Sequence, residues 1–95
     1  MGTNYFYVLV CCDNSLYAGY TNNLDVRIKK HNSGKGAKYT RARKPVQLIY
    51  YEEFEDKTLA LKKEVSFKKL NRNQKLLYLQ KRGVELCGLN QVLRE

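Results

Sequence analysis

A chain of 95 residues, 43% of them hydrophobic, has room for one folded domain with a modest core, which excludes a large multidomain protein and a disordered one. It contains no apolar run long enough to span a membrane and begins without a basic leader, so we expect a soluble, cytoplasmic protein with no membrane partner. Eighteen Lys and Arg against nine Asp and Glu give a net charge of +9, which favours a polyanionic partner.

The first part of the chain has the pattern of a β-hairpin. Residues 5–12 (YFYVLVCC) are aromatic and β-branched, which predicts a largely buried strand. The turn residues 13–15 (DNS) follow, and the short segment 16–20 (LYAGY) is predicted to be the second strand of the hairpin.

A helix is predicted after the hairpin. Asn22 or Asn23 can cap its start, and the pattern continues to about Asn32 with Leu24 and Ile28 facing the core. Two glycines and five cations in 34–45 (GKGAKYTRARKP) predict an exposed loop after this helix.

The second half of the chain is predicted to hold one strand and two helices. The strand covers 46–54, and Asp56 can cap a helix that ends near Leu70. Asn71 and Gln74 have the spacing of a capping box for a last helix, which is closed by Gly83. The expected fold is α/β of the α+β kind: a small three-stranded antiparallel sheet flanked by helices, in one domain over 1–83 with a C-terminal tail at 84–95.

The positive charge is concentrated in two segments. One covers 27–44 and contains no acid, and the other covers 62–82, where Glu64 is the only acid. Such segregation suits a nucleic acid, because neutralising phosphates releases counterions. The alternative is a solvated surface that keeps the protein soluble, and charge alone does not separate DNA from RNA or from an anionic membrane.

Five residues of the hairpin and the first helix form a candidate site. Tyr7 and Tyr17 lie on strands that are expected to pair, and Gly19 permits a close approach of other groups to the backbone. Arg27 and His31 are four residues apart and therefore share one face of the helix. A fixed cation and an imidazole beside two phenols can bind a phosphodiester. Taken singly, each residue also has an ordinary role as a core tyrosine, a helix-end histidine or a solvated arginine.

Glu64 is a candidate metal ligand. It lies three residues before Phe67, on or beside the helix face that is expected to pack on the sheet. A single carboxylate can hold Mg²⁺ together with water and a substrate phosphate. The alternative is an i,i+4 ion pair with Lys68, which is worth only about 0.3–0.5 kcal/mol on a helix surface.

With these residues in place, the sequence resembles the GIY-YIG nuclease superfamily, and in particular its small standalone bacterial members. Tyr5–Tyr7 occupies the Gly-Ile-Tyr element and keeps its tyrosine, and Tyr17–Gly19 occupies the Tyr-Ile-Gly element with Ala18 for Ile. The segment 31–41 (HNSGKGAKYTR) is close to the loop of the standalone members. The similarity runs from about Tyr5 to Arg82.

The resemblance also assigns roles within the candidate site. It implies metal-dependent endonuclease hydrolysis of DNA phosphodiester bonds with Mg²⁺ or Mn²⁺, in which Tyr7 or Tyr17 helps to deprotonate the attacking water. Arg27 binds the scissile phosphate, His31 orients a tyrosine or transfers a proton, and Glu64 holds the cation. The phenol that acts as base is expected to have its pKa lowered by Arg27 and the cation.

The family often has a C-terminal Asn that supports the site, and neither Asn71 nor Asn73 is assigned to that role. We expect substrate binding through the nucleic-acid backbone, with any further specificity supplied by a protein partner. The alternatives are a weakly active or inactive nucleic-acid-binding module and an RNA-associated structural module. The expected binding residues are Lys30, Lys35, Lys38, Arg41, Arg43, Lys44, Lys68 and Arg72.

Overall fold

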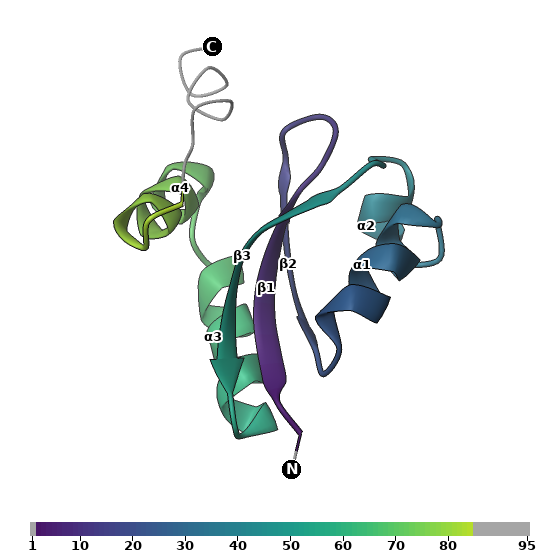
Figure 1. Ribbon diagram of the computed structural model, residues 1–95. Helices are drawn as coiled ribbons and strands as arrows, with labels where there is room; N and C mark the ends of the chain where they lie inside the picture. The colour runs from purple at the N-terminus through teal and green to yellow at the C-terminus, as the bar shows by residue number, and fades with distance from the viewer. Residues whose placement is uncertain (1, 85–95) are drawn as a thin grey trace.

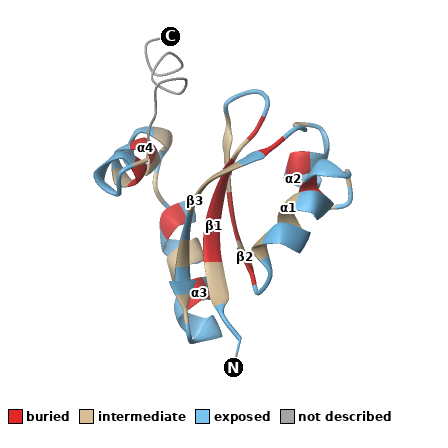
Figure 2. Cartoon of the chain, in the orientation of Figure 1, coloured by how far each residue is buried: buried red, intermediate tan, exposed pale blue. Residues whose placement is uncertain are grey.

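The strand β1 (Asn4–Val10) lies at the centre of a three-stranded antiparallel sheet with the order β2-β1-β3. Its side chains are apolar on both faces, and the four residues from Phe6 to Leu9 are fully buried. A strand that is covered on both faces has a continuous apolar run instead of the alternating pattern of a half-exposed strand. Figure 2 shows this burial along β1.

The computed structural model describes residues 2–84. The helices cover both faces of the sheet, with α1 and α2 on one side and α3 and α4 on the other (Figure 1). The remaining elements are β2 (Leu16–Thr21), α1 (Leu24–Asn32), α2 (Lys38–Arg41), β3 (Gln47–Phe54), α3 (Lys57–Lys68) and α4 (Arg72–Lys81). The predicted α+β fold with a three-stranded antiparallel sheet is therefore confirmed.

Two apolar clusters hold these layers together. Phe6 and Val8 point from β1 toward Phe67 of α3 and the buried leucines of α4. Tyr7 and Leu9 point to the opposite face, where Leu24 and Ile28 of α1 are among the residues that pack against them. The alternation of side-chain direction along β1 thus points Tyr7 toward α1. Leu24 and Ile28, the predicted core residues of that helix, lie on the side that faces Tyr7.

The predicted helix caps are confirmed. The Asn23 side chain accepts from the Val26 amide at the start of α1, and the Asp56 side chain accepts from the Thr58 amide at the start of α3. α4 begins with the capping box that its sequence predicts. Asn71 therefore caps α4, which gives it a structural role of its own.

The segment 34–45 differs from its prediction as an open loop. It contains the one-turn helix α2, in which Thr40 is fully buried. Thr40 is buried because α2 packs against α1. Its hydroxyl contacts His31 of α1 and donates to the Ala37 carbonyl at the start of α2. Of the predicted tail 84–95, residues 85–95 lie outside the described part of the chain. Within residues 2–84, no helix has the length and apolarity needed to cross a membrane.

Candidate active site

The Tyr7 side chain lies across the neighbouring strand β2, where the residue opposite it is Gly19. A Cβ atom at position 19 would lie 2.5 Å from the Tyr7 hydroxyl, a distance that real Cβ contacts do not show. The absence of a side chain at Gly19 therefore makes room for the phenol of Tyr7. Gly19 is predicted to permit the close approach of another group, and in the structure that group is the phenol of Tyr7.

A chain of hydrogen bonds joins three of the predicted site residues. Arg27 Nε lies 3.3 Å from the Tyr7 hydroxyl, and His31 Nε2 lies 2.9 Å from the same oxygen. On the other side of the imidazole, His31 Nδ1 lies 2.8 Å from Thr40 Oγ1. Tyr7, His31 and Thr40 are fully buried. The spacing of Arg27 and His31 along α1 allows both to reach one phenol.

Burial and charge determine the protonation of this chain. Burial, and then the positive charge of Arg27, lower the pKa of His31 from 6.5 to about 4, so the imidazole is neutral at pH 7. The pKa of Tyr7 is raised, because the loss of solvation outweighs the hydrogen bond from Arg27. Tyr17 and Glu64 also raise it electrostatically. In the protein alone, Arg27 therefore does not bring the pKa of Tyr7 below its ordinary value, and the expected lowering by Arg27 and a bound cation together stays a prediction.

Tyr17 lies beside this chain of hydrogen bonds. Its ring centroid is 6.4 Å from that of Tyr7 and 5.3 Å from that of His31. It also stacks on Tyr39, at 6.0 Å between ring centroids. The two phenols thus share one surface of the sheet as predicted. The Tyr7 hydroxyl is within hydrogen-bond distance of both His31 and Arg27, whereas Tyr17 interacts more weakly with Arg27.

Glu64 pairs with Lys68, at 2.8 Å between Oε2 and Nζ. The two side chains differ in exposure, because 18% of Glu64 and 48% of Lys68 is accessible. Lys68 Nζ also lies 5.6 Å from the centroid of the Tyr17 ring, so the ion pair lies beside the two phenols. The proposed i,i+4 pair is therefore present, and it lies at the candidate site.

The donor set fits a hard divalent cation held by a single carboxylate. Glu64 is mostly buried, and its charge acts on the phenol of Tyr7. Among residues 2–84 there is no group of three or more His, Cys, Asp or Glu side chains that would form an all-protein metal cage. Mg²⁺ commonly binds one or two carboxylates and completes its coordination with water and substrate phosphate.

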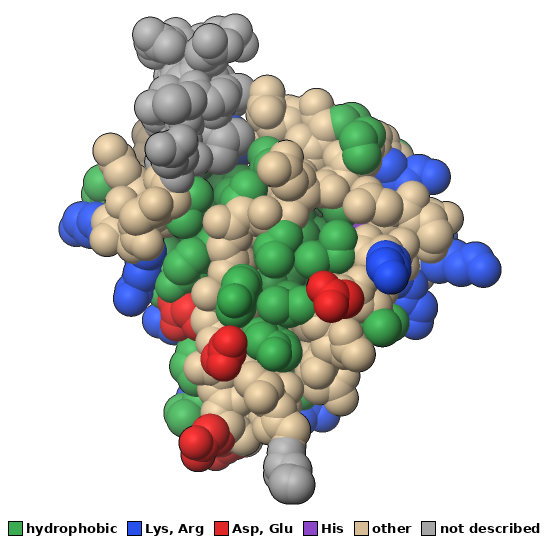
Figure 3. Space-filling model, viewed as in Figure 1, with side chains coloured by type: hydrophobic (Ala, Val, Ile, Leu, Met, Phe, Trp, Pro, Cys, Tyr) green, Lys and Arg blue, Asp and Glu red, His purple; other side chains and the backbone are tan. Residues whose placement is uncertain are grey.

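The predicted nucleic-acid-binding residues fall into two groups. Arg43 pairs with Asp13 at 3.2 Å and lies over the Tyr39 ring, and Arg72 donates to the Asn14 carbonyl at 2.9 Å. These two arginines, like Lys68, have partners within the protein, and their assignment as nucleic-acid contacts stays a prediction. The other predicted residues are exposed near α1 and α2: Lys30, Lys35, Lys38, Arg41 and Lys44. Figure 3 shows cations on this side of the molecule.

The GIY-YIG catalytic domain family matches residues 3–77, which include every residue of this site. The chain belongs to the GIY-YIG family. A UPF0213 protein of Pediococcus pentosaceus is 53% identical over 85 residues, covering 90% of each chain. A UPF0213 protein of Bacillus cereus is 62% identical over 76 residues, covering 80% of this chain and 79% of the relative.

Two solution NMR structures are similar to this GIY-YIG protein. One, from E. faecalis, is 49% identical with a TM-score of 0.62 and covers 90% of this chain and 91% of its own. The other, a UPF0213 protein of Bacillus halodurans, is 46% identical with a TM-score of 0.58 and covers 85% and 86%. These relatives confirm that the chain resembles small bacterial members of the family.

Sequence reasoning missed two residues of the GIY-YIG site. The sequence predicts an exposed loop around Thr40, whereas in the structure the Thr40 hydroxyl contacts His31. A Cβ at Gly36 would lie 2.4 Å from His31 Nδ1, so only glycine leaves room for the imidazole in this position. The small residues of the basic segment were the available signal, but no periodic pattern indicates that the segment turns back onto α1.

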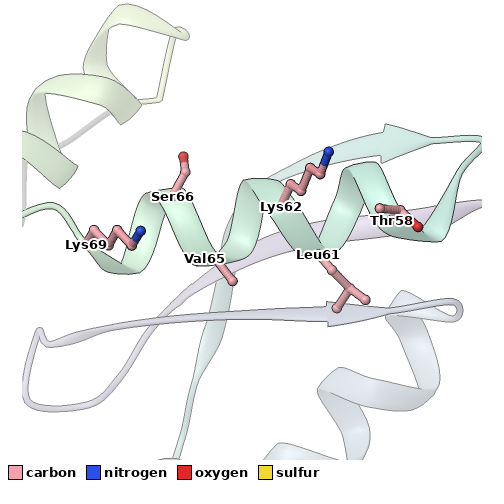
Figure 4. Close-up of a pocket in the computed structure, with 6 residues that line it drawn as sticks. All are labelled: Thr58, Leu61, Lys62, Val65, Ser66 and Lys69. Carbon is pink, nitrogen blue, oxygen red and sulfur yellow. The ribbon is translucent and has the colours of Figure 1, made fainter.

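A separate hollow on α3 contains none of the predicted site residues. It is lined by Leu61 and Val65, which point to the same side of the helix, together with Thr58, Lys62, Ser66 and Lys69 (Figure 4). Leu61 and Val65 are 37% and 54% exposed. The hollow is therefore a surface feature of α3, apart from the hydrogen-bonded chain of Tyr7.

The free energy of unfolding should fall as the pH drops from about 6.5 to about 4. The upper value is the pKa of His31 in the unfolded chain, and the lower one is its pKa in the folded protein. In this window the unfolded chain binds a proton that the folded protein excludes, so acid favours unfolding, by about 1–3 kcal/mol. Chemical denaturation at several pH values measures this. His31→Gln should make the free energy of unfolding depend less on pH between 6.5 and 4. The same pH dependence in parent and variant would contradict the assignment of this loss of stability to His31.

Proposed function

We propose that this protein is an endonuclease that hydrolyses phosphodiester bonds of DNA with the help of Mg²⁺ or Mn²⁺. The observation that carries this proposal is the chain Arg27–Tyr7–His31, in which Tyr7 and His31 are fully buried, with hydrogen bonds of 3.3 and 2.9 Å. It combines a phosphate-binding cation, a phenol and a neutral imidazole, which are suited to phosphate binding and proton transfer. Membership of a nuclease family supports the same activity.

Arg27 is the residue that first meets the scissile phosphate in this proposal. Its side chain is partly exposed, and its Nε lies 3.3 Å from the Tyr7 hydroxyl. Tyr7 itself has no exposed surface, so the attacking water reaches its hydroxyl once the guanidinium moves toward the phosphate. Substrate binding thereby opens the phenol to the water that it must deprotonate.

Tyr7 and His31 then move the protons. Tyr7 takes a proton from the attacking water as its own hydroxyl proton passes to His31 Nε2, and the hydroxide attacks the phosphorus atom. The bond from phosphorus to one sugar oxygen breaks, that oxygen takes up a proton from solvent, and His31 returns its extra proton to solvent. Pairing of Arg27 with a phosphate cancels one of the two causes that hold the pKa of His31 low, which favours this transfer. Glu64 would hold the divalent cation, which supplies charge stabilisation at the scissile phosphate when bound.

A second candidate is a nucleic-acid-binding module that does not cut. It is favoured by the burial of the Tyr7 hydroxyl and by the ion pair that occupies Glu64. Incubation of the purified protein with plasmid, single-stranded and branched DNA, with Mg²⁺ or with EDTA, separates the two. Cleavage that requires the cation supports the nuclease, while gel shifts without product support the binding module. RNA tested in parallel would reveal an RNA-associated module.

DNA binding should depend steeply on salt. If four of the exposed cations near α1 and α2 contact phosphates, the slope of log K against log [salt] is expected to be about −4 on duplex DNA. Replacement of Lys35, Lys38, Arg41 and Lys44 by Ala should flatten the slope and weaken all sequences alike, because backbone contacts do not select sequence. Fluorescence anisotropy at several salt concentrations measures both quantities.

A matched control removes four cations elsewhere. Replacement by Ala of four exposed lysines on α3, at its C-terminal end and on α4 changes the net charge by the same amount as in the first variant. These residues are Lys57, Lys62, Lys69 and Lys81. This variant should keep most of the parent slope. Equal slopes in the parent and the first variant would remove this surface from the binding site.

A further inference from the structure

The arrangement of donors and acceptors around His31 permits only one imidazole tautomer. Arg27 is a donor only, so its Nε–H donates to the Tyr7 oxygen. The Tyr7 hydroxyl must then donate its own hydrogen elsewhere, and His31 Nε2 is the acceptor within reach among the described residues, at 2.9 Å. Nε2 is therefore unprotonated, and the hydrogen of the neutral ring lies on Nδ1.

Thr40 completes the chain at the other end. The Nδ1–H of His31 donates to Thr40 Oγ1 at 2.8 Å, and the Thr40 hydroxyl donates to the Ala37 carbonyl at 3.0 Å. In the opposite tautomer, Tyr7 would receive two hydrogens, and its own would have no acceptor among residues 2–84. A buried donor left unpaired is unfavourable, because it loses its hydration without gaining a hydrogen bond in return. Every hydrogen has a partner only in the first arrangement.

We infer that Thr40 is a positioning residue that holds His31 in the Nδ1–H tautomer, so that Nε2 accepts the proton of Tyr7. Gly36 supports this position, because its backbone lies against the imidazole and a Cβ there would be 2.4 Å from Nδ1. The tautomer follows from the hydrogen bonds alone. The consequence for cleavage rests on the proposed function.

A hydroxyl in this place differs from a carboxylate in what it does for the imidazole. It fixes the tautomer but adds no negative charge to stabilise an imidazolium. The groups that face His31 are Tyr7 from β1, Tyr17 from β2, Arg27 from its own helix and Thr40 from α2. None of these side chains carries a carboxylate that would stabilise the protonated ring. The imidazolium is therefore short-lived, and it loses its extra proton after each turnover.

The test uses the fact that His31 is the only histidine of the chain. The ¹⁵N chemical shifts of its two ring nitrogens distinguish a protonated from an unprotonated nitrogen, with no need to assign overlapping signals. We expect the parent protein at pH 7 to show a protonated Nδ1 and an unprotonated Nε2. Thr40→Ser keeps a hydroxyl and should keep these shifts, whereas Thr40→Val removes it and should shift the ring toward the other tautomer or a mixture.

Cleavage should follow the tautomer. Thr40→Val is expected to lower kcat about 10- to 100-fold, the usual loss when a group that orients an imidazole is removed, with little change in DNA affinity. Thr40→Ser should restore most of the rate. An Nε2–H tautomer in the parent, or unchanged shifts in a folded Thr40→Val variant, would overturn the inference. Because the parent's shifts need no activity, a protein with the expected tautomer but no cleavage would contradict the proposed function alone.

Discussion

Replacement of Tyr7 by Phe is expected to lower the rate of metal-dependent DNA cleavage by about 10²–10⁴-fold, the usual contribution of a general acid or base. The variant keeps the ring that fills the core and loses only the hydroxyl that contacts His31 and Arg27. Because those two partners lose a hydrogen bond, we also expect a loss of stability of about 1–3 kcal/mol. Single-turnover cleavage with saturating protein separates the chemical step from binding.

Tyr17→Phe is the matched control for this experiment. The Tyr17 ring packs beside both Tyr7 and His31, and its hydroxyl interacts with Arg27 more weakly than the Tyr7 hydroxyl does. We therefore expect a much smaller loss of rate than in Tyr7→Phe. A larger loss in Tyr17→Phe would transfer the role of base to Tyr17, and full activity in both variants would exclude tyrosine chemistry.

The sheet and the helix starts could be predicted because their signals are local. The uninterrupted apolar run of β1 indicates burial on both faces, and the side chains of Asn23 and Asp56 cap the first turns of α1 and α3. Arg27 and His31 could be placed on one face because helical spacing fixes their relation. These features depend on residues close together in the sequence.

The features that sequence did not reveal depend on contacts between distant segments. Thr40 reaches His31 only because α2 folds back onto α1, and nothing in the basic segment indicates that turn. The pKa of Tyr7 in the protein alone is raised for a related reason. Arg27 was found from its spacing, but the burial that outweighs it comes from packing of the whole sheet against α1.

Glu64→Gln is expected to abolish magnesium-dependent cleavage, because an amide is a poor substitute for the carboxylate that is proposed to hold Mg²⁺. The substitution is nearly isosteric, so the packing of α3 should be unchanged. Loss of the ion pair with Lys68 should cost at most about 1 kcal/mol, since nearly half of the Lys68 side chain is exposed and solvent screens the pair. Cleavage and thermal unfolding, measured side by side, separate the two roles.

Lys68→Met provides the matched control, because it breaks the same ion pair and leaves the carboxylate in place. If Glu64 acts as a metal ligand, Lys68→Met should still cut with Mg²⁺, whereas Glu64→Gln should not. DNA binding without metal should remain equal or become tighter in Glu64→Gln, because a negative charge near the phosphates is removed. Parent-level cleavage by Glu64→Gln would exclude the metal site. If both variants lost cleavage and thermal stability together, Glu64 would instead serve the fold, through the ion pair that fixes α3 beside Tyr17.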